Sequence, residues 1–335
     1  MRGRGAYLAA KVGWALLTLA LVITFNFVLF RILPGDPARA IAHDPRISPE
    51  TVAALTARFG LDKPLFLDFD GGNLFDSQFV AYLGRLAVGD LGVSYAFRDR
   101  NVVDMLGLGL VNTLWLILPA NVLAIMVGTI AGLIAAWRRG TTIDTGALTI
   151  GLILWATPTF FMGIILLFLG AAWFDLPTAG KQTIGADYAS FWEAAADFGR
   201  HLLMPTLTFT LVLLGEYLLI MRSSVIEVFS EDYILTAKAK GLSTFRIVRD
   251  HALRNAMLPM VTLIAINLGF VVSGAIQVEA VFSWPGIGQL TVNAVRERDY
   301  PVLQGAFLLL AISVVLANLA AELLYGWLDP RVREA

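Results

Sequence analysis

Few side chains in this sequence have the type and spacing that catalysis or metal binding requires. The chain contains no cysteine, which removes disulfides, thiolate metal sites and cysteine nucleophiles. Its three histidines, His43, His201 and His251, are scattered without the spacing of a metal site. The sequence also lacks His-Glu-x-x-His, Gly-x-Ser-x-Gly and a pair of aspartates inside an apolar stretch. We therefore predict a chain that is not an enzyme and holds no metal.

A nucleotide-binding loop is also absent. A Walker A loop needs Gly-x4-Gly-Lys followed by Ser or Thr, because its backbone and its lysine hold the phosphates. The only Gly-Lys pair, Gly180-Lys181, is followed by Gln182, and Asp175 stands where the first glycine belongs. We expect no cofactor on this chain, so any ATP and Mg²⁺ that drive it are used by partner subunits.

The remaining candidates for chemistry are polar side chains inside apolar stretches. Polar groups within membrane-spanning helices are costly, so each is a candidate for lining a substrate path. The alternative is structural, because asparagine often hydrogen-bonds a neighbouring helix and an acid near a helix end can be paired or interfacial. Glu216 is the deepest acid, about 9 Å from the helix end at Arg222 by helical rise. The candidate path residues are Asn112, Asn121, Glu216, Asn267 and Asn318, and Asn26 is a further polar group of this kind.

The composition indicates that membrane-spanning helices position these groups. The chain has 335 residues, of which 57% are hydrophobic and 15% charged, and its mean hydropathy is +0.72. A soluble domain has about 45–50% apolar and about 25% charged residues. The net charge of −1 provides no basic surface for nucleic acid. These values exclude a soluble enzyme and a nucleic-acid-binding protein, and they predict an all-α integral membrane protein in the lipid bilayer.

Six apolar stretches are long enough to cross a bilayer, which takes about 20 residues of helix. They are Val12–Phe30, Met105–Trp137, Thr145–Phe174, His201–Met221, Asn255–Val278 and Tyr300–Ala321, the last continuing to about Trp327. Gly128 and Gly132 lie four residues apart in the second stretch and predict close packing between helices. Glu279 and Glu322 lie near helix ends, and we expect both to be solvated.

The distribution of Lys and Arg predicts that both termini are cytoplasmic. With a cytoplasmic amino terminus, the inside segments hold 13 Lys and Arg in 62 residues and the outside segments hold 11 in 126. This asymmetry follows the positive-inside rule. The first stretch has 19 apolar residues and no small-residue cleavage site after it. We interpret it as a retained signal anchor rather than a removed signal peptide.

The chain is predicted to have four parts. They are a cytoplasmic amino terminus with the first helix (1–33), an extracytoplasmic segment rich in Pro and Gly turns (34–104), a core of five membrane helices (105–327) and a cytoplasmic tail (328–335). Within the extracytoplasmic segment, Ser48–Phe59 is typical of a short helix, with Ser48 as its cap and Pro49 in its first position.

The most informative segment is the predicted cytoplasmic loop 222–257, which is far longer than a turn between neighbouring helices needs. Residues 224–240 keep apolar positions near helical spacing, Gly241 interrupts the pattern, and a second helical stretch follows over 243–254. A helix–glycine–helix arrangement at the membrane surface predicts a bent, rigid structure that docks a cytoplasmic partner. The alternative is a pair of amphipathic helices that only anchors the chain.

Residues 232–243 and 251–259 resemble the coupling loop of ABC importer permeases, and they are most similar to the dipeptide, oligopeptide and nickel branch. Other matches to this family follow in order along the whole chain, and together they are specific although each is weak alone. They are Leu33-Pro-Gly-Asp-Pro37, Gly89-Asp-Leu-Gly-Val-Ser94, Thr157-Pro-Thr-Phe160, His201-Leu-Leu-Met-Pro205, Val278-Glu-Ala-Val-Phe-Ser-Trp-Pro-Gly-Ile-Gly288, Arg298-Asp-Tyr-Pro301 and Asp329-Pro-Arg331.

The loop departs from the general importer signature, which is Glu-Ala-Ala, three residues, Gly, nine residues and Ile-x-Leu-Pro. Leu235 and Thr236 stand where Glu and the first Ala belong. His251 and Arg254 stand at the Ile and Pro positions. The peptide branch resembles this variant, so no role of the missing glutamate is transferred to this chain.

The resemblance implies a type I ABC importer permease fold and a non-catalytic transport subunit of a bacterial or archaeal cytoplasmic membrane (the cell inner membrane). It also implies three protein partners, which are a second homologous permease, two cytoplasmic ATPase domains or subunits, and an extracytoplasmic solute-binding protein. The substrate path would lie between the two permeases and open by alternating access. The residues implied in coupling to the ATPase are Phe229, Tyr233, Ala237, Lys238, Ala239, Lys240, Gly241 and Leu242.

The substrate is expected to be a di- or oligopeptide, with nickel or another small solute as the alternative. A self-contained secondary transporter is a weaker alternative, because it would need an ion-coupling pair or internal repeats that the sequence does not show. The turn Trp284-Pro285-Gly286 is expected at the outer face, as a candidate contact for the solute-binding protein.

Overall fold

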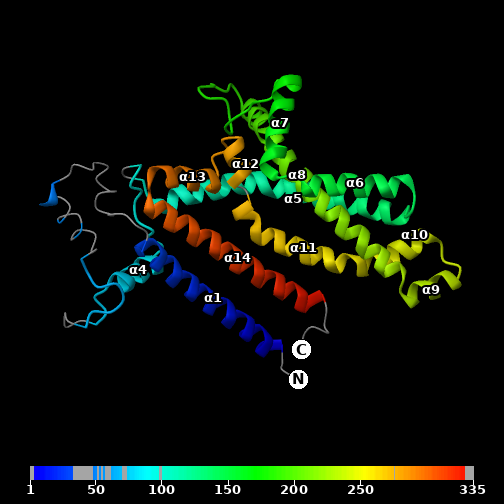
Figure 1. Cartoon of the computed structure of the whole chain (residues 1–335), viewed down its shortest axis with the longest axis horizontal. Coiled ribbons are helices and arrows are strands. Elements are labelled where there is room, and N and C mark those ends of the chain that lie inside the picture. The colour runs from blue at the N-terminus through cyan, green and yellow to red at the C-terminus, as the bar shows by residue number, and fades with distance from the viewer. Residues whose placement is uncertain are drawn as a thin grey trace.

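The computed structural model describes residues 4–32, 48–50, 53, 56, 62–69, 74–97, 100–274 and 276–328. Every regular element in that part of the chain is a helix, which confirms the all-α prediction (Figure 1). The elements are α1 (Arg4–Ile32), α4 (Gln78–Ala87), α5 (Val102–Trp137), α6 (Thr142–Ala156), α7 (Thr159–Phe174), α8 (Phe191–Phe229), α9 (Asp232–Ala239), α10 (Thr244–Arg246), the π-helical turn η1 (Ile247–Ala252), α11 (Leu253–Gly274), α12 (Ile276–Val281), α13 (Ile287–Glu297) and α14 (Tyr300–Leu328). Most of the helix expected over Ser48–Phe59, and nearly all of the tail 328–335, lie outside the described residues.

Four single helices of the described chain are long and apolar enough to cross a membrane, namely α1, α5, α8 and α14. Each contains one of the predicted stretches. The predicted fifth stretch, Asn255–Val278, falls on α11 and α12, between which residue 275 lies outside the described residues. α5 and α8 have 36 and 39 residues, so they extend well beyond the roughly 30 Å of a bilayer's hydrocarbon core.

The predicted third stretch, Thr145–Phe174, is not one continuous helix. The structure has two shorter helices there, α6 and α7, whose axes differ by 102°. The break falls at Thr157-Pro158, where Thr157 is in an extended conformation. Proline has no N–H to continue the helix, and its ring disfavours the helical conformation of the preceding residue. The pair can act as one span only as a bent unit.

The helices form a bundle with two distinct ends (Figure 1). α1 and α14 pack antiparallel, and α11 lies along the other side of α14. α8 packs along α5 and α6. α9 and α10 lie at one end of the bundle, and α4 lies at the opposite end.

Small residues bring α5 and α8 into close contact, as the spacing of Gly128 and Gly132 predicted. A Cβ built at Gly132 would stand 2.6 Å from the carbonyl oxygen of Leu218, and one at Gly128 would stand 2.7 Å from Cβ of Tyr217. Both distances are too short for a real side chain, so the close approach of α8 to α5 at these two positions requires glycine. Gly215 of α8 makes the same kind of contact with α6, since its Cβ would stand 2.6 Å from the carbonyl oxygen of Gly151.

A pair of alanine substitutions in α5 tests this packing. We expect Gly132→Ala to destabilise the fold by about 1–3 kcal/mol, because the new methyl group meets backbone that cannot rotate away. Gly107→Ala, in the same helix, places its methyl group in open space. It should be neutral, or stabilising by about 0.5–1 kcal/mol. Thermal unfolding of both purified variants in detergent measures the difference, and equal melting temperatures would contradict the close approach.

Candidate functional site

The predicted loop 222–257 is a helical structure at one end of the bundle. α8 continues without a break to Phe229, eight residues beyond the predicted span end at Met221. α9 follows, and the second predicted helical stretch is α10 and η1, which run directly into α11. The bent helix–glycine–helix shape is thus confirmed. The region is not a separate loop, because the end of α8 and the turn η1 before α11 form a large part of it. We call residues 228–252 the coupling segment.

The coupling segment has its own apolar core. Ile234, Ala237, Ile247 and Ala252 form a buried cluster, and Val228, Phe229 and Leu242 pack against it. Three of the eight residues implied in coupling therefore face the interior of the segment, namely Phe229, Ala237 and Leu242. Because these side chains are packed against one another, the coupling segment is a folded unit rather than a flexible connection.

Gly241 forms the corner that ends α9. Its φ is +76°, in the left-handed region that glycine adopts without strain. The N–H of Gly241 donates to the carbonyl of Lys238, and the N–H of Leu242 donates to that of Ala237. These two bonds are those of a Schellman motif, in which glycine follows the helix and the next apolar residue packs back on it.

The other implied coupling residues lie on the outside. Tyr233, Lys238, Ala239 and Lys240 are exposed on α9 and its end. The Lys238 ammonium lies 5.6 Å from the centre of the Phe229 ring, and the Tyr233 hydroxyl accepts a 2.7 Å hydrogen bond from Asn255. The exposed face therefore offers an aromatic ring, a small residue and two ammonium groups.

The same segment carries a surface ion pair on its second helical stretch. Arg249 donates 2.6 Å and 3.0 Å hydrogen bonds to the neighbouring carboxylate of Asp250. This contact lowers the pKa of Asp250. The exposed charges of α9 are two acids at its start, Glu231 and Asp232, and two lysines at its end, Lys238 and Lys240.

Three of the five candidate path residues meet inside the bundle. Asn267 of α11 donates hydrogen bonds to the Glu216 carboxylate at 3.1 Å and to the Tyr217 hydroxyl at 3.2 Å. The Tyr217 hydroxyl lies 3.5 Å from the side-chain oxygen of Asn121 on α5. We call Asn121, Glu216, Tyr217 and Asn267 the polar chain. Tyr217 and Asn121 are buried, whereas Glu216 and Asn267 are partly exposed, so the chain reaches the surface of this subunit on the α8 and α11 side.

Tyr217 was not among the residues that sequence reasoning selected. Its hydroxyl connects two selected residues that belong to different helices. The sequence feature that could have identified Tyr217 is its position next to Glu216 in an otherwise apolar stretch.

The other polar candidates are not part of the polar chain. Asn112 bonds the carbonyl of Pro285 at 2.8 Å, and Asn26 bonds the carbonyl of Gln304 at 3.3 Å. Asn318 is exposed on α14. Asn112 and Asn26 therefore hydrogen-bond a neighbouring segment, which was the structural alternative to lining a substrate path.

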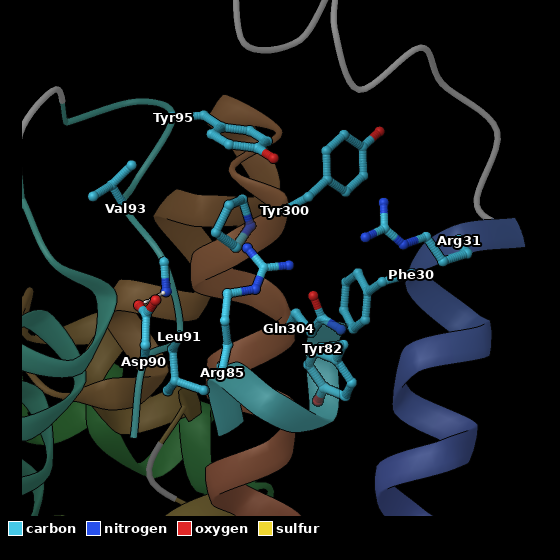
Figure 2. Close-up of a pocket in the computed structure, with 13 residues that line it drawn as sticks. Phe30, Arg31, Tyr82, Arg85, Asp90, Leu91, Val93, Tyr95, Tyr300 and Gln304 are labelled. Atoms are coloured by element: carbon cyan, nitrogen blue, oxygen red, sulfur yellow. Dashed lines mark hydrogen bonds between the residues drawn. The ribbon is translucent and has the colours of Figure 1, made fainter. Parts of the chain in front are cut away.

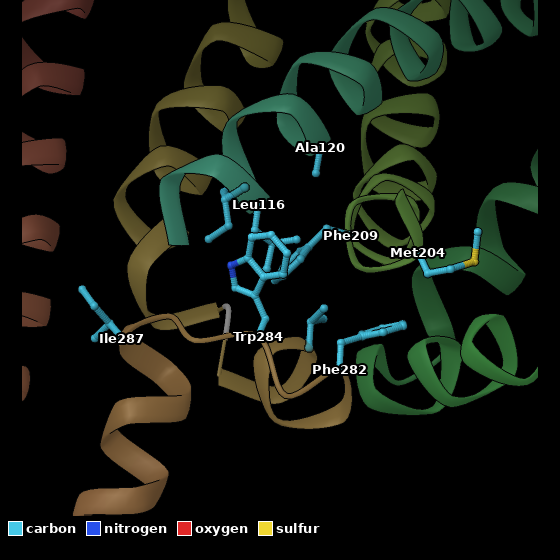
Figure 3. Packing of buried hydrophobic residues seen from close by; sticks show 9 residues of the cluster. Leu116, Ala120, Met204, Phe209, Phe282, Trp284 and Ile287 are labelled. Atoms are coloured by element: carbon cyan, nitrogen blue, oxygen red, sulfur yellow. The ribbon is translucent and has the colours of Figure 1, made fainter. Parts of the chain in front are cut away.

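The turn between α12 and α13 is tightly packed. Trp284 is fully buried in a cluster with Leu116, Ile117, Phe209 and Phe282, so only Pro285 and Ser283 of this turn are exposed (Figure 3). Its indole N–H donates a 2.9 Å hydrogen bond to the carbonyl of Asn112. The tryptophan thus anchors the turn to α5, and it is not free to contact a solute-binding protein.

The expectation that Glu279 is solvated is wrong. Its side chain has no exposed surface. The carboxylate accepts a 2.6 Å hydrogen bond from the Thr113 hydroxyl and a 3.0 Å bond from the N–H of Gln289. The Thr113 hydroxyl in turn accepts from the N–H of Ile287 at 2.9 Å. Glu279 and Thr113 together satisfy N–H groups in the first turn of α13, where a negative charge is favourable.

A pair of asparagine variants tests the polar chain. We expect Asn267→Leu to reduce uptake severalfold, because it removes the donor from both the Glu216 carboxylate and the Tyr217 hydroxyl. Asn293→Leu is the control, a partly exposed asparagine of α13 that is not among the candidate path residues and accepts a hydrogen bond from Gln289 of the same helix. Solute uptake by cells, normalised to the amount of the chain in the membrane, gives the comparison. Equal uptake by the two variants would remove the polar chain from the path.

The architecture is that of a multi-pass membrane protein with a packed helical segment at one end and a polar chain between its helices. This is the organisation of a membrane transport subunit. The chain belongs to the family described as the binding-protein-dependent transport system inner membrane component, whose model matches residues 128–334. The model for the amino-terminal part of such components matches residues 6–116.

Relatives match the chain along nearly its whole length. It is 36% identical to the di/tripeptide transport system permease protein DppB of Pseudomonas aeruginosa, over 98% of both chains. It is 34% identical to the dipeptide transport system permease protein DppB of Escherichia coli K12, again over 98% of both. It is 36% identical to the glutathione transport system permease protein GsiC of Escherichia coli, over 94% of this chain and 95% of that protein.

A solved structure confirms the fold. A chain of the inward-facing MetNI methionine ABC transporter superposes with a TM-score of 0.53 at 18% identity. The match covers 67% of this chain and 96% of the other. The predicted fold, that of type I ABC importer permeases, is therefore confirmed.

Proposed function

We propose that this chain is the permease subunit of an ATP-driven importer that moves di- or oligopeptides across the cytoplasmic membrane. The observation that carries this proposal is its 36% identity to a di/tripeptide permease over 98% of both chains. Because the alignment with this relative covers 98% of both chains, it includes both the amino-terminal region and the coupling segment.

The coupling segment would receive the motion of the ATPase. Tyr233, Lys238, Ala239 and Lys240 are exposed and would contact the ATPase surface. Phe229, Ala237 and Leu242 would act indirectly, because their packing holds α9 at a fixed angle to α8 and α11. The ATPase subunits would bind ATP and Mg²⁺, and this chain would bind neither.

The partners and the orientation follow from the same proposal. The end of the bundle with α9 and α10 would face the cytoplasm, as would both termini. A second, homologous permease would cover the side where Glu216 and Asn267 reach the surface, so that the path runs between the two subunits. A solute-binding protein would deliver the peptide at the opposite end.

Purification of the tagged full-length chain from native membranes in mild detergent tests the proposal. Mass spectrometry should find a second six-span permease, ATPases with Walker A loops and a solute-binding protein. ATP hydrolysis by this complex should rise when the binding protein carries a dipeptide. Recovery of the chain alone would contradict the proposal and favour a self-contained transporter, and stimulation by nickel or another solute but not by peptide would overturn the substrate assignment.

A further inference from the structure

The molecule has a pocket at the end of the bundle opposite the coupling segment. Its volume is about 150 Å³, and it lies between the end of α1, α4, the start of α14 and the segment 90–95 (Figure 2). A single water needs only about 10–15 Å³ by this kind of measure, so the pocket can hold a group of several heavy atoms. The polar side chains that matter here are Arg31, Arg85, Tyr95, Tyr300 and Gln304.

The lining of the pocket carries two arginines and one carboxylate. Arg31 of α1 and Arg85 of α4 direct their guanidinium groups toward each other, above the amide of Gln304 (Figure 2). Within the described residues, neither guanidinium has an ion pair with a carboxylate; Arg31 instead lies 5.5 Å from the centre of the Phe27 ring. The one acid of the lining is Asp90, which accepts a 2.8 Å hydrogen bond from the N–H of Gly92. Two facing guanidinium groups repel each other, and an anion between them would remove this repulsion.

The wall of the pocket is held in place by a buried carboxylate. Asp299, just before α14, accepts hydrogen bonds from the N–H groups of Tyr95 and Ala96 at 3.1 Å and 3.2 Å, and from the Ser94 hydroxyl. Asp299 is 1% exposed. This contact fixes the segment that carries Tyr95 against the start of α14, which carries Tyr300 and Gln304. The pocket is therefore shaped by the fold before any ligand binds.

The position of the pocket favours an amphiphilic anion. Arg31 is the last residue of the apolar span of α1, and only 11% of the most apolar part of that span is buried. The apolar span of α1 also exposes Leu21 and Phe25, 63% and 67% of whose surfaces are accessible. A ligand with its phosphate in the pocket could lay acyl chains along this surface. A small water-soluble anion, or an acidic side chain of another protein, would leave the apolar surface unused.

We propose that this pocket binds the phosphate headgroup of an anionic phospholipid, with Arg31 and Arg85 as the phosphate ligands. Arginine suits this task because its planar group donates two parallel hydrogen bonds to phosphate oxygens. The bound lipid joins α1, α4 and α14 at the membrane surface.

Native mass spectrometry of the full-length chain with added lipids tests the proposal. The probes are phosphatidylglycerol, phosphatidylcholine with the same acyl chains, and glycerol 1-phosphate. We expect one phosphatidylglycerol to remain bound at collision energies that remove phosphatidylcholine. Arg85→Glu should weaken this binding about tenfold or more, the loss expected for one charge-assisted contact that becomes repulsive. Arg85 is exposed, so this variant should fold.

Arg100→Glu is the matched control, since Arg100 is an exposed arginine near the same end that does not line the pocket. It should retain phosphatidylglycerol as the unaltered chain does. Equal retention of the two lipids, or full retention by Arg85→Glu, would overturn the proposal. Displacement of the lipid by glycerol 1-phosphate at equal concentration would show a site for soluble phosphate instead. If Arg85→Glu keeps the lipid but loses stimulation by the solute-binding protein, the occupant is an acidic group of that protein.

Discussion

Replacing Gly241 with valine should uncouple ATP hydrolysis from uptake while the chain still inserts into the membrane. Gly241 has a φ of +76°, and a residue with a Cβ pays about 1–2 kcal/mol there, more when it is β-branched. No atom lies within 4 Å of a Cβ built at this position, so strain rather than collision is the cause. The strain opens the corner after α9 and changes the angle at which the exposed lysines meet the ATPase. Uptake of a labelled dipeptide by cells and ATP hydrolysis by the purified complex measure the two activities.

Gly140→Val is the control for this experiment. Gly140 has a φ of +77°, and it also has no atom within 4 Å of a built Cβ, so the substitution introduces the same strain in the turn between α5 and α6. Gly140→Val should keep uptake coupled to hydrolysis. Normal uptake in Gly241→Val, or equal losses in both variants, would contradict the coupling role of α9.

Replacing Glu279 with alanine should destabilise the protein by about 2–4 kcal/mol. The substitution leaves the N–H of Gln289 and the Thr113 hydroxyl without their acceptor in a place that water does not reach, and each buried donor without a partner costs about 1–3 kcal/mol. It also leaves space against Gly286, where a Cβ would overlap the Glu279 carboxylate. Thermal unfolding in detergent and the amount of chain in the membrane measure the effect.

Glu193→Ala is the matched comparison. The Glu193 carboxylate also accepts a backbone hydrogen bond, from Ala189 at 2.9 Å, but its site is exposed. Water can replace that acceptor, so the loss should stay below about 1 kcal/mol. Equal stability of Glu279→Ala and Glu193→Ala would show that Glu279 does not organise the turn before α13.

Apolar length was enough to predict the spans at α1, α5, α8 and α14, because crossing a bilayer requires a long run of apolar residues. The same signal could not predict the direction of the chain after Thr157-Pro158. The residues on both sides are apolar, and the 102° angle depends on how α7 packs against α8 and α12. Pro158 explains why the helix ends there but does not determine the angle.

The polar residues show a second limit of sequence reasoning. Asn121, Glu216 and Asn267 were three of the five candidate path residues, and only the fold shows that these three meet through Tyr217. Glu279 was missed because its partner Thr113 lies 166 residues away in the chain. Its own neighbours in sequence, a short apolar run and a glycine-rich turn, are equally typical of a solvated helix end. Burial of a single acid depends on long-range packing.

The uninterrupted course of α8 has a mechanical consequence. Pro205, the fifteenth residue of this helix, removes a hydrogen bond, and from there α8 continues to Phe229 without another proline. These 25 residues form a rod of roughly 37 Å. If the rod pivots at Pro205, each degree of tilt displaces its far end by about 0.6 Å, from the same helical rise. A tilt of α8 by a few degrees among the membrane helices therefore displaces the start of α9 by a few ångströms. In the other direction, a displacement of α9 by a few ångströms tilts α8 within the bilayer by only a few degrees.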